Sequence, residues 1–128
     1  VLPVKLPGEN EFMSPVVEDW TDWGSLSFRF YLPEELPQSA EICFFTKDWD
    51  HLWRQIGKPL PPRRKTTVRF DLPIAGDEAA ALWSPVGHFR PWHPLTPGQL
   101  LEFGFRVELK TGADDVFEGN IYLMAAWL

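Results

Sequence analysis

Prolines and glycines are spread along the whole chain of 128 residues. The chain has 13 prolines and 9 glycines, and almost every span of twelve residues contains one of them. Proline interrupts a helix because it lacks an N–H donor and clashes with the preceding turn, and glycine because it loses the most conformational entropy. Long helices are therefore nearly excluded, and we expect many short strands joined by turns.

Hydrophobic residues alternate with polar ones in several segments, with the period of two that a half-buried strand requires. The clearest runs cover residues 24–32, 65–73 and 100–109. Segment 40–47 is apolar on both faces, which is typical of a central strand, and residues 75–83 form the one helix-like stretch. The pattern predicts an all-β fold, an antiparallel β-sandwich of the jelly-roll type with at most one short helix.

The length indicates one domain over residues 1–128. Residues 1–15 contain three prolines and no stable period, so we expect an extended lead-in that pairs late or not at all. A single cysteine, Cys43, excludes an internal disulfide, and its place in segment 40–47 predicts a small buried side chain.

The overall charge bears on the class of partner. Lys and Arg total 12 against 18 Asp and Glu, which gives a formal charge of −6 and an isoelectric point near 5.0. A phosphate backbone would be repelled, so we do not expect nucleic acid as a partner. No apolar run is long enough to cross a bilayer, and no membrane partner is expected.

Catalytic and metal-binding patterns are weak in this sequence. The histidines His51, His88 and His93 do not have the short spacings of metal ligands. Acidic pairs such as Asp114 with Asp115 lie in turns, where solvated carboxylates are common. We therefore expect no enzyme, and keep a small hydrolase or lyase as a remote alternative.

Aromatic and basic residues gather between Asp48 and His93, which hold four of the seven tryptophans, all three histidines and five arginines. A large ring left near solvent can stack on the C–H face of a sugar, whose hydroxyls then need polar neighbours. Trp49 and Trp53 could flank a sugar, or Trp53 could be core with Trp49 as its cover. Trp83 is expected to pin its own loop, which makes Trp92 the better binder.

Three arginines fall on the outward positions of predicted strands, namely Arg29, Arg69 and Arg106. If those strands are neighbours, the guanidinium groups and Tyr122 form a polar stripe that could donate hydrogen bonds to hydroxyls or uronic carboxylates. The alternative is a set of cross-strand ion pairs. The carboxylates expected for these pairs are Asp71, Glu102 and Glu108.

Several segments together resemble the galactose-binding-like jelly-roll domains that serve as non-catalytic carbohydrate-binding modules of polysaccharide-degrading enzymes. The resemblance lies in GSLSFRFYLPEELP, ICFFTKDWDHLWRQ, TTVRFDLP, a loop ending GHFRPW, LEFGFRVEL and FEGNIYL, from about Val16 to the end of the chain. It implies a polysaccharide or oligosaccharide bound on a concave sheet face or on the loops of one rim. It also implies an accessory role beside a catalytic domain of a larger extracellular or periplasmic protein.

Many members of that family hold a structural calcium ion, commonly with a carboxylate in the final strand. Here Met124 stands where the resemblance leads us to expect an Asp, so we expect no cofactor. Glu18, Asp19 and Asp22 leave calcium as the alternative, because they supply oxygen ligands near the N-terminus.

The sequence thus predicts non-catalytic carbohydrate binding by aromatic stacking and side-chain hydrogen bonds. The alternative is a structural or protein-interaction module that docks through the same exposed aromatics. The predicted ligand-binding residues are Trp49, Trp53, Trp92, Arg29, Arg54, Gln55, Arg69, His88, Arg90, Arg106 and Tyr122.

Overall fold

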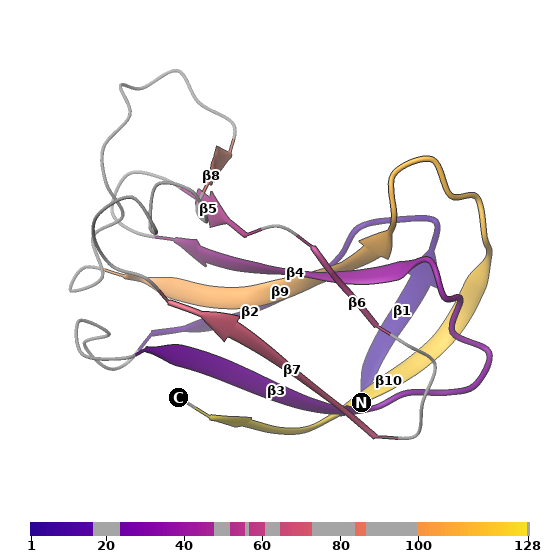
Figure 1. Cartoon of the computed structure of the whole chain (residues 1–128), viewed down its shortest axis with the longest axis horizontal. Helices are drawn as coiled ribbons and strands as arrows, with labels where there is room; N and C mark the ends of the chain where they lie inside the picture. The colour runs from indigo at the N-terminus through magenta and orange to yellow at the C-terminus, as the bar shows by residue number, and fades with distance from the viewer. Residues whose placement is uncertain are drawn as a thin grey trace.

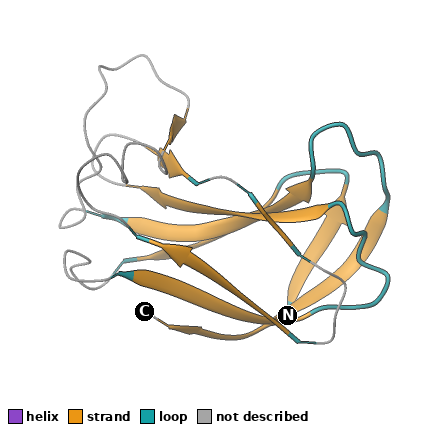
Figure 2. Cartoon of the chain, viewed as in Figure 1, coloured by secondary structure: helices purple, strands orange, loops and turns teal. Residues whose placement is uncertain are grey.

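The computed structural model describes residues 1–16, 24–47, 52–55, 57–60, 65–72, 84–86 and 100–127. All regular structure in these ranges is β-strand (Figure 2), and none of it is a helix that could span a membrane. The helix-like segment 75–83 lies outside them. The strands are β1 (Leu2–Leu6), β2 (Asn10–Pro15), β3 (Ser25–Tyr31), β4 (Ala40–Lys47), β5 (Leu52–Arg54), β6 (Lys58–Pro59), β7 (Thr66–Asp71), β8 (Ser84–Val86), β9 (Glu102–Leu109) and β10 (Phe117–Trp127).

The strands form two antiparallel sheets that pack face to face (Figure 1). The four-stranded sheet has the order β1-β10-β3-β7. The six-stranded sheet has the order β2-β9-β4-β5-β8, and β6 also pairs with β4. This arrangement confirms the predicted all-β sandwich.

The core between the sheets is rich in phenylalanine. The Phe28 ring centroid lies 5.2 Å from that of Phe105 on the opposite sheet and 6.2 Å from that of Phe44. The inward positions expected for β3 and β7 are all buried. In β9, Phe105 and Val107 are buried as predicted, whereas Leu101 precedes the strand and is exposed. Alternation therefore placed the core correctly wherever the strand itself is regular.

Strand β4 is central, as its two apolar faces predict. It pairs with β9 on one side and with β5 and β6 on the other. Phe44 faces the core, while Cys43 and Phe45 are buried on the outer side of the sheet. The outer face of the six-stranded sheet must therefore be covered by other side chains.

The predicted lead-in forms two strands, one in each sheet. β1 pairs with β10, and β2 pairs with β9. Val4 and Leu6 are buried in the core, because β1 keeps the alternation that its prolines obscure in the sequence. The lead-in thus closes one edge of each sheet rather than preceding the domain.

Strand β10 departs from simple alternation. Its pairing with β3 shifts register between Leu123 and Ala125, the mark of a β-bulge. An extra residue reverses which later side chains face outward, so Trp127 lies opposite Ser27 and is 42% exposed. Before the bulge, Leu123 pairs with the buried Phe30 and is itself 40% exposed.

Candidate functional site

The outer face of the four-stranded sheet brings together three of the predicted binding residues. Arg29 on β3, Arg69 on β7 and Tyr122 on β10 lie on neighbouring strands and are exposed. The predicted polar stripe required these strands to be neighbours, and they are neighbours for these three residues. Arg106 lies on β9 in the other sheet and does not join them. We call this surface the open face.

Three exposed aromatic rings lie on the open face. Tyr31, Tyr122 and Trp127 are 39%, 41% and 42% exposed, and we call them the aromatic strip. The two tyrosines are directly opposite in register, with ring centroids 6.0 Å apart at an interplanar angle of 74°. Arg29 Cζ lies 5.4 Å from the centroid of the Trp127 ring, within cation–π range. On the open face the two tyrosines are thus in contact with each other, and the Arg29 guanidinium with the indole ring.

Arg69 pairs with a carboxylate of its own strand. Its Nη2 lies 3.4 Å from Asp71 Oδ1, and both side chains are about two thirds exposed. An exposed pair of this kind contributes little to stability and leaves the guanidinium accessible. The ion pair expected between Arg69 and Asp71 is thus present, and it does not close the surface.

A pocket of about 710 Å³ adjoins the aromatic strip. It lies between the turn after β3 and the first half of β10, and Tyr31 and Tyr122 form part of its wall. Glu34, Glu118 and Asn120 supply polar groups along its lining. A ligand that lies on the two tyrosines would therefore reach hydrogen-bonding side chains at that end of the strip.

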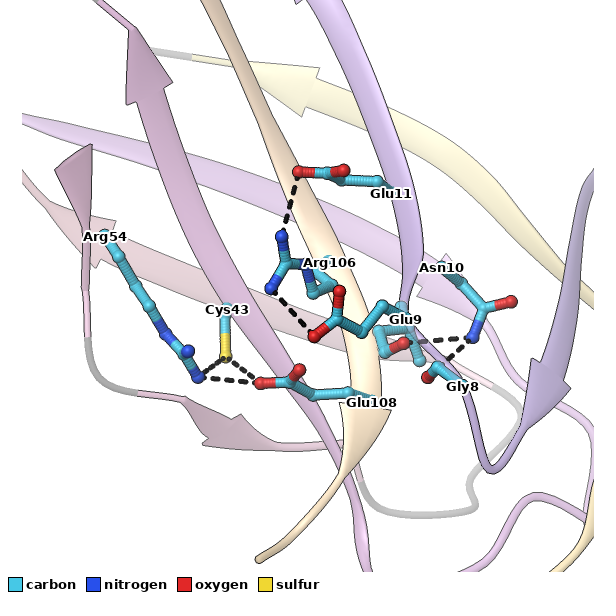
Figure 3. Close-up of polar contacts among 9 residues, drawn as sticks. Gly8, Glu9, Asn10, Glu11, Cys43, Arg54, Arg106 and Glu108 are labelled. Carbon is cyan, nitrogen blue, oxygen red and sulfur yellow. Dashed lines mark hydrogen bonds and ion pairs between the residues drawn. The ribbon is translucent and has the colours of Figure 1, made fainter. Parts of the chain in front are cut away.

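The outer face of the six-stranded sheet is organised differently (Figure 3), and we call it the closed face. Arg106 Nη1 lies 3.4 Å from Glu9 Oε1, and its Nη2 donates to Glu11 Oε1 at 3.2 Å. On the same face, Arg54 of β5 reaches across β4, and its Nη2 donates to Glu108 Oε1 of β9 at 2.7 Å. Both guanidinium groups are therefore occupied by carboxylates of the chain itself.

The two arginines also cover the aromatic ring beneath them. Arg106 Cζ lies 4.7 Å and Arg54 Cζ 5.9 Å from the ring centroid of Phe45, which is fully buried. Gly104 lies opposite Phe45, and a Cβ added to it would approach the Phe12 carbonyl oxygen to 2.0 Å. The missing side chain lets β2 approach β9 closely at this position.

The Cys43 thiol belongs to this network. Its Sγ donates to Glu108 Oε1 at 3.2 Å and accepts from Arg54 Nη2 at 3.2 Å. Burial, together with the hydrogen bond to the Glu108 carboxylate, raises the pKa of Cys43 to about 11 against the opposing charge of Arg54. Cys43 is buried, as the sequence predicted. Its protonated thiol also makes hydrogen bonds with Glu108 and Arg54, which the sequence did not predict.

Arg106 pairs with other carboxylates than those expected from the sequence. Glu102 and Glu108 lie on its own strand, whereas its partners Glu9 and Glu11 come from the lead-in. This difference follows from β2, which pairs with β9 and places Glu11 directly opposite Arg106. Arg106 therefore forms cross-strand ion pairs, as the alternative hypothesis expected. Its partners could not be identified without knowing that β2 pairs with β9.

Two predicted binding residues are buried. Trp53 is 1% exposed and packs in the core, the position that the sequence left open as its alternative. Gln55 is 2% exposed, and its Nε2 donates to the Asp71 carbonyl oxygen at 2.6 Å. Neither side chain presents a surface to a ligand in this structure. Predicted residues that lie outside the described ranges are Trp49, His88, Arg90 and Trp92.

Tyr31 and Trp127 were not among the predicted binding residues. The signal for Tyr31 was available, because it shares the outward alternation of Arg29 in the same strand. Trp127 gave no such signal, because the bulge that turns it outward follows from the pairing with β3.

Comparisons with family models, curated proteins and solved structures return no match. Within the described ranges, no group of three or more His, Cys, Asp or Glu side chains is arranged to hold a metal ion. The case for a function therefore depends on the geometry of the two faces.

Proposed function

We propose that this chain is a non-catalytic carbohydrate-binding domain and that the open face is its binding surface. The observation that supports this most directly is the aromatic strip, three rings that are each about 40% exposed on neighbouring strands of one sheet. Isolated exposed hydrophobics are ordinary, whereas a contiguous group marks an interaction surface.

A sugar is the ligand whose chemistry suits this surface. Its axial C–H groups stack on an aromatic face, and its hydroxyls accept hydrogen bonds from a nearby guanidinium. Arg29 lies beside Trp127, and Arg69 lies opposite Ser27 on the next strand. The strip supplies the apolar contact, while the arginines supply the donors that fix orientation.

The expected affinity is modest and additive along the strip. Each stacked ring contributes about 1 kcal/mol, and a solvent-exposed rim adds little more. Useful affinity then requires several sugar units at once, so the proposed ligand is a polysaccharide or a longer oligosaccharide. We propose the accessory role in a larger extracellular or periplasmic protein on the same basis, because such binding serves to hold another domain on a polymer.

Affinity electrophoresis on a panel of soluble polysaccharides tests the proposal. We expect at least one polymer to retard the protein. We expect Trp127→Ala and Tyr122→Ala each to weaken that binding about fivefold, which corresponds to about 1 kcal/mol per ring, without lowering the melting temperature. Leu101→Ala is the matched control, because Leu101 is an exposed apolar residue that precedes β9 in the six-stranded sheet. Trp92→Ala, run in the same gels, tests the loop residue predicted from the sequence.

Two results would overturn the proposal. One is the absence of retardation by every polymer in a broad panel. The other is retardation that persists undiminished in the Trp127→Ala and Tyr122→Ala variants, which would place binding elsewhere. Release of reducing ends from any polymer would instead show an enzyme.

A further inference from the structure

The polar groups of the open face differ between its two ends. At one end Arg69 and Trp127 both lie opposite Ser27, on either side of β3. At the other end lies the pocket of about 710 Å³, with Tyr31 and Tyr122 in its wall. The cationic side chains thus belong to the indole end, and the lining of the pocket sets what the tyrosine end can bind.

The lining of the pocket is anionic. Glu34 and Glu35 come from the turn after β3, Glu118 comes from β10, and all three side chains are exposed. Glu118 and Tyr122 lie four residues apart on β10, so both side chains lie on the outward side of the strand. Among the described residues that line the pocket there is no lysine, arginine or histidine. A ligand in the pocket therefore meets three carboxylates beside an aromatic wall.

Within the described part of the chain, no cation forms an ion pair with these three carboxylates. Lys5 lies opposite Glu118 on β1, and it does not line the pocket. The closed face is different, because there Arg54 and Arg106 bind carboxylates of the chain. The negative charge of the pocket is therefore available to a ligand.

The tyrosine pair suits a cation as well as a sugar. The two rings are 6.0 Å apart at an interplanar angle of 74°, an edge-to-face arrangement. A cation close to an aromatic face is attracted by the ring quadrupole, and adjacent carboxylates add to that attraction. An ammonium group carried on a sugar ring uses both features, since the sugar stacks on a ring while the amine reaches the carboxylates.

The two ends of the open face are far enough apart to contact different sugar units. Tyr31 and Ser27 mark the two ends on β3, and four residues of a strand span about 13 Å. That distance exceeds the screening length of about 10 Å at 0.1 M salt, so Arg69 repels an amine in the pocket only weakly. The pocket volume also falls in the range of about 300–1,000 Å³ that is usual for ligand sites.

We propose that the pocket binds the amino group of a sugar unit, so that the ligand of the open face is a polysaccharide with free amines. This inference rests on the proposed carbohydrate binding and adds the charge of the ligand. Glu34, Glu35 and Glu118 accept hydrogen bonds from the ammonium group, and Asn120 bonds to a hydroxyl. Anionic polymers are disfavoured, because the pocket and the net charge of −6 both repel them.

A basic peptide would meet the same carboxylates. Trp127 lies farther along the same outer face and offers another exposed ring with the Arg29 guanidinium beside it. A second ring with a cationic donor suits another sugar unit of the same polymer, whereas a further basic side chain would be repelled there. The open face therefore favours the amino-sugar polymer over the peptide.

Isothermal titration calorimetry with two soluble polymers of the same backbone tests the proposal. Glycol chitosan carries free amines, and the same preparation after complete N-acetylation carries none. We expect the amine form to bind the wild type about fivefold tighter or more, because several exposed charge pairs contribute together. We expect that ratio to fall as the salt concentration rises, since salt screens exposed pairs.

Variants assign the preference to the pocket. Glu118→Gln keeps the shape of the side chain, and we expect it to weaken binding of the amine form about threefold and to leave the acetylated form unchanged. Glu102→Gln is the matched control, because Glu102 is also an exposed glutamate on a strand and lies in the six-stranded sheet. Tyr122→Ala should weaken both forms, because the ring stacks on the sugar in each. Equal melting temperatures would show that the variants remain folded.

The outcomes separate this inference from carbohydrate binding itself. Equal affinity for the two forms overturns the inference and supports the proposed function, and so does binding of another polysaccharide when neither form binds. No binding of any polymer overturns both. An amine preference that Glu118→Gln and Glu102→Gln reduce equally overturns the inference, because it would then reflect net charge. A lysine oligomer that binds as tightly as glycol chitosan also overturns it, because the pocket would then recognise charge without the sugar.

Discussion

The two outer faces of the sandwich are built from the same residue types and differ in how those residues are used. On the closed face, Arg54 and Arg106 bind carboxylates of the chain and cover the ring of Phe45. On the open face, the rings of Tyr122 and Trp127 are about 40% exposed, and Arg29 lies beside one of them. Aromatic and basic residues therefore do not by themselves indicate a binding surface.

What separates the faces is the supply of carboxylates from neighbouring strands. Glu11 of β2 and Glu9, which precedes that strand, pair with Arg106, and Glu108 of β9 pairs with Arg54. On the open face, the ion pair of Arg69 with Asp71 is longer, 3.4 Å, and both side chains are about two thirds exposed. A guanidinium that binds carboxylates of its own chain stabilises the fold, whereas one that is exposed to solvent can bind something else.

The largest expected difference between the faces is the loss of stability when an aromatic ring is removed from each of them. Phe45→Ala should lower the free energy of unfolding by about 3–5 kcal/mol, because it leaves a cavity under two arginines in a fully buried site. Tyr122→Ala on the open face should change it by about 0.5 kcal/mol or less. Urea unfolding monitored by circular dichroism measures both, and similar losses would contradict the distinction between the faces.

Titration of the Cys43 thiol on the closed face is expected to have a smaller effect on the free energy of unfolding. Because the pKa of Cys43 is raised to about 11 in the folded state, the native protein keeps a proton that the unfolded chain loses near its ordinary pKa of 9.0. The stabilisation is complete below pH 9 and declines as pH rises toward 11, by an amount on the order of 2 kcal/mol. Urea unfolding between pH 7 and pH 11 measures this slope.

Cys43→Ala supplies the reference for that titration, since it removes the titrating group. The variant should lack the additional decline above pH 9, whatever its stability at neutral pH. Parallel pH profiles for the wild type and Cys43→Ala would show that the thiol is not held protonated by its surroundings.

A small effect on stability is also expected for the Arg29→Ala variant. Its contact with Trp127 is exposed, so Arg29→Ala should lower the free energy of unfolding by less than about 1 kcal/mol. The same substitution should reduce retardation by the polysaccharide that binds best, and Arg29→Lys should restore it only in part because the planar donor pair is lost. A large change in stability with unchanged retardation would place Arg29 among the structural arginines.

Prediction from the sequence succeeded where strands are regular. Alternation identified the buried faces of β3 and β7 and the central position of β4. It failed in the lead-in, because prolines at positions 3, 7 and 15 hide two strands whose partners lie about a hundred residues away. Alternation cannot place the side chains after the bulge in β10, because only the pairing partner reveals an extra residue.

The sequence by itself determined that this chain forms short strands around a phenylalanine-rich core, because periodicity and turn residues act over a few neighbouring positions. The tertiary structure decided which arginines bind carboxylates of the chain, and that Trp53 is buried and Trp127 exposed. These properties depend on strands that are distant in sequence and adjacent in space, and the local pattern of residues contains no record of that adjacency.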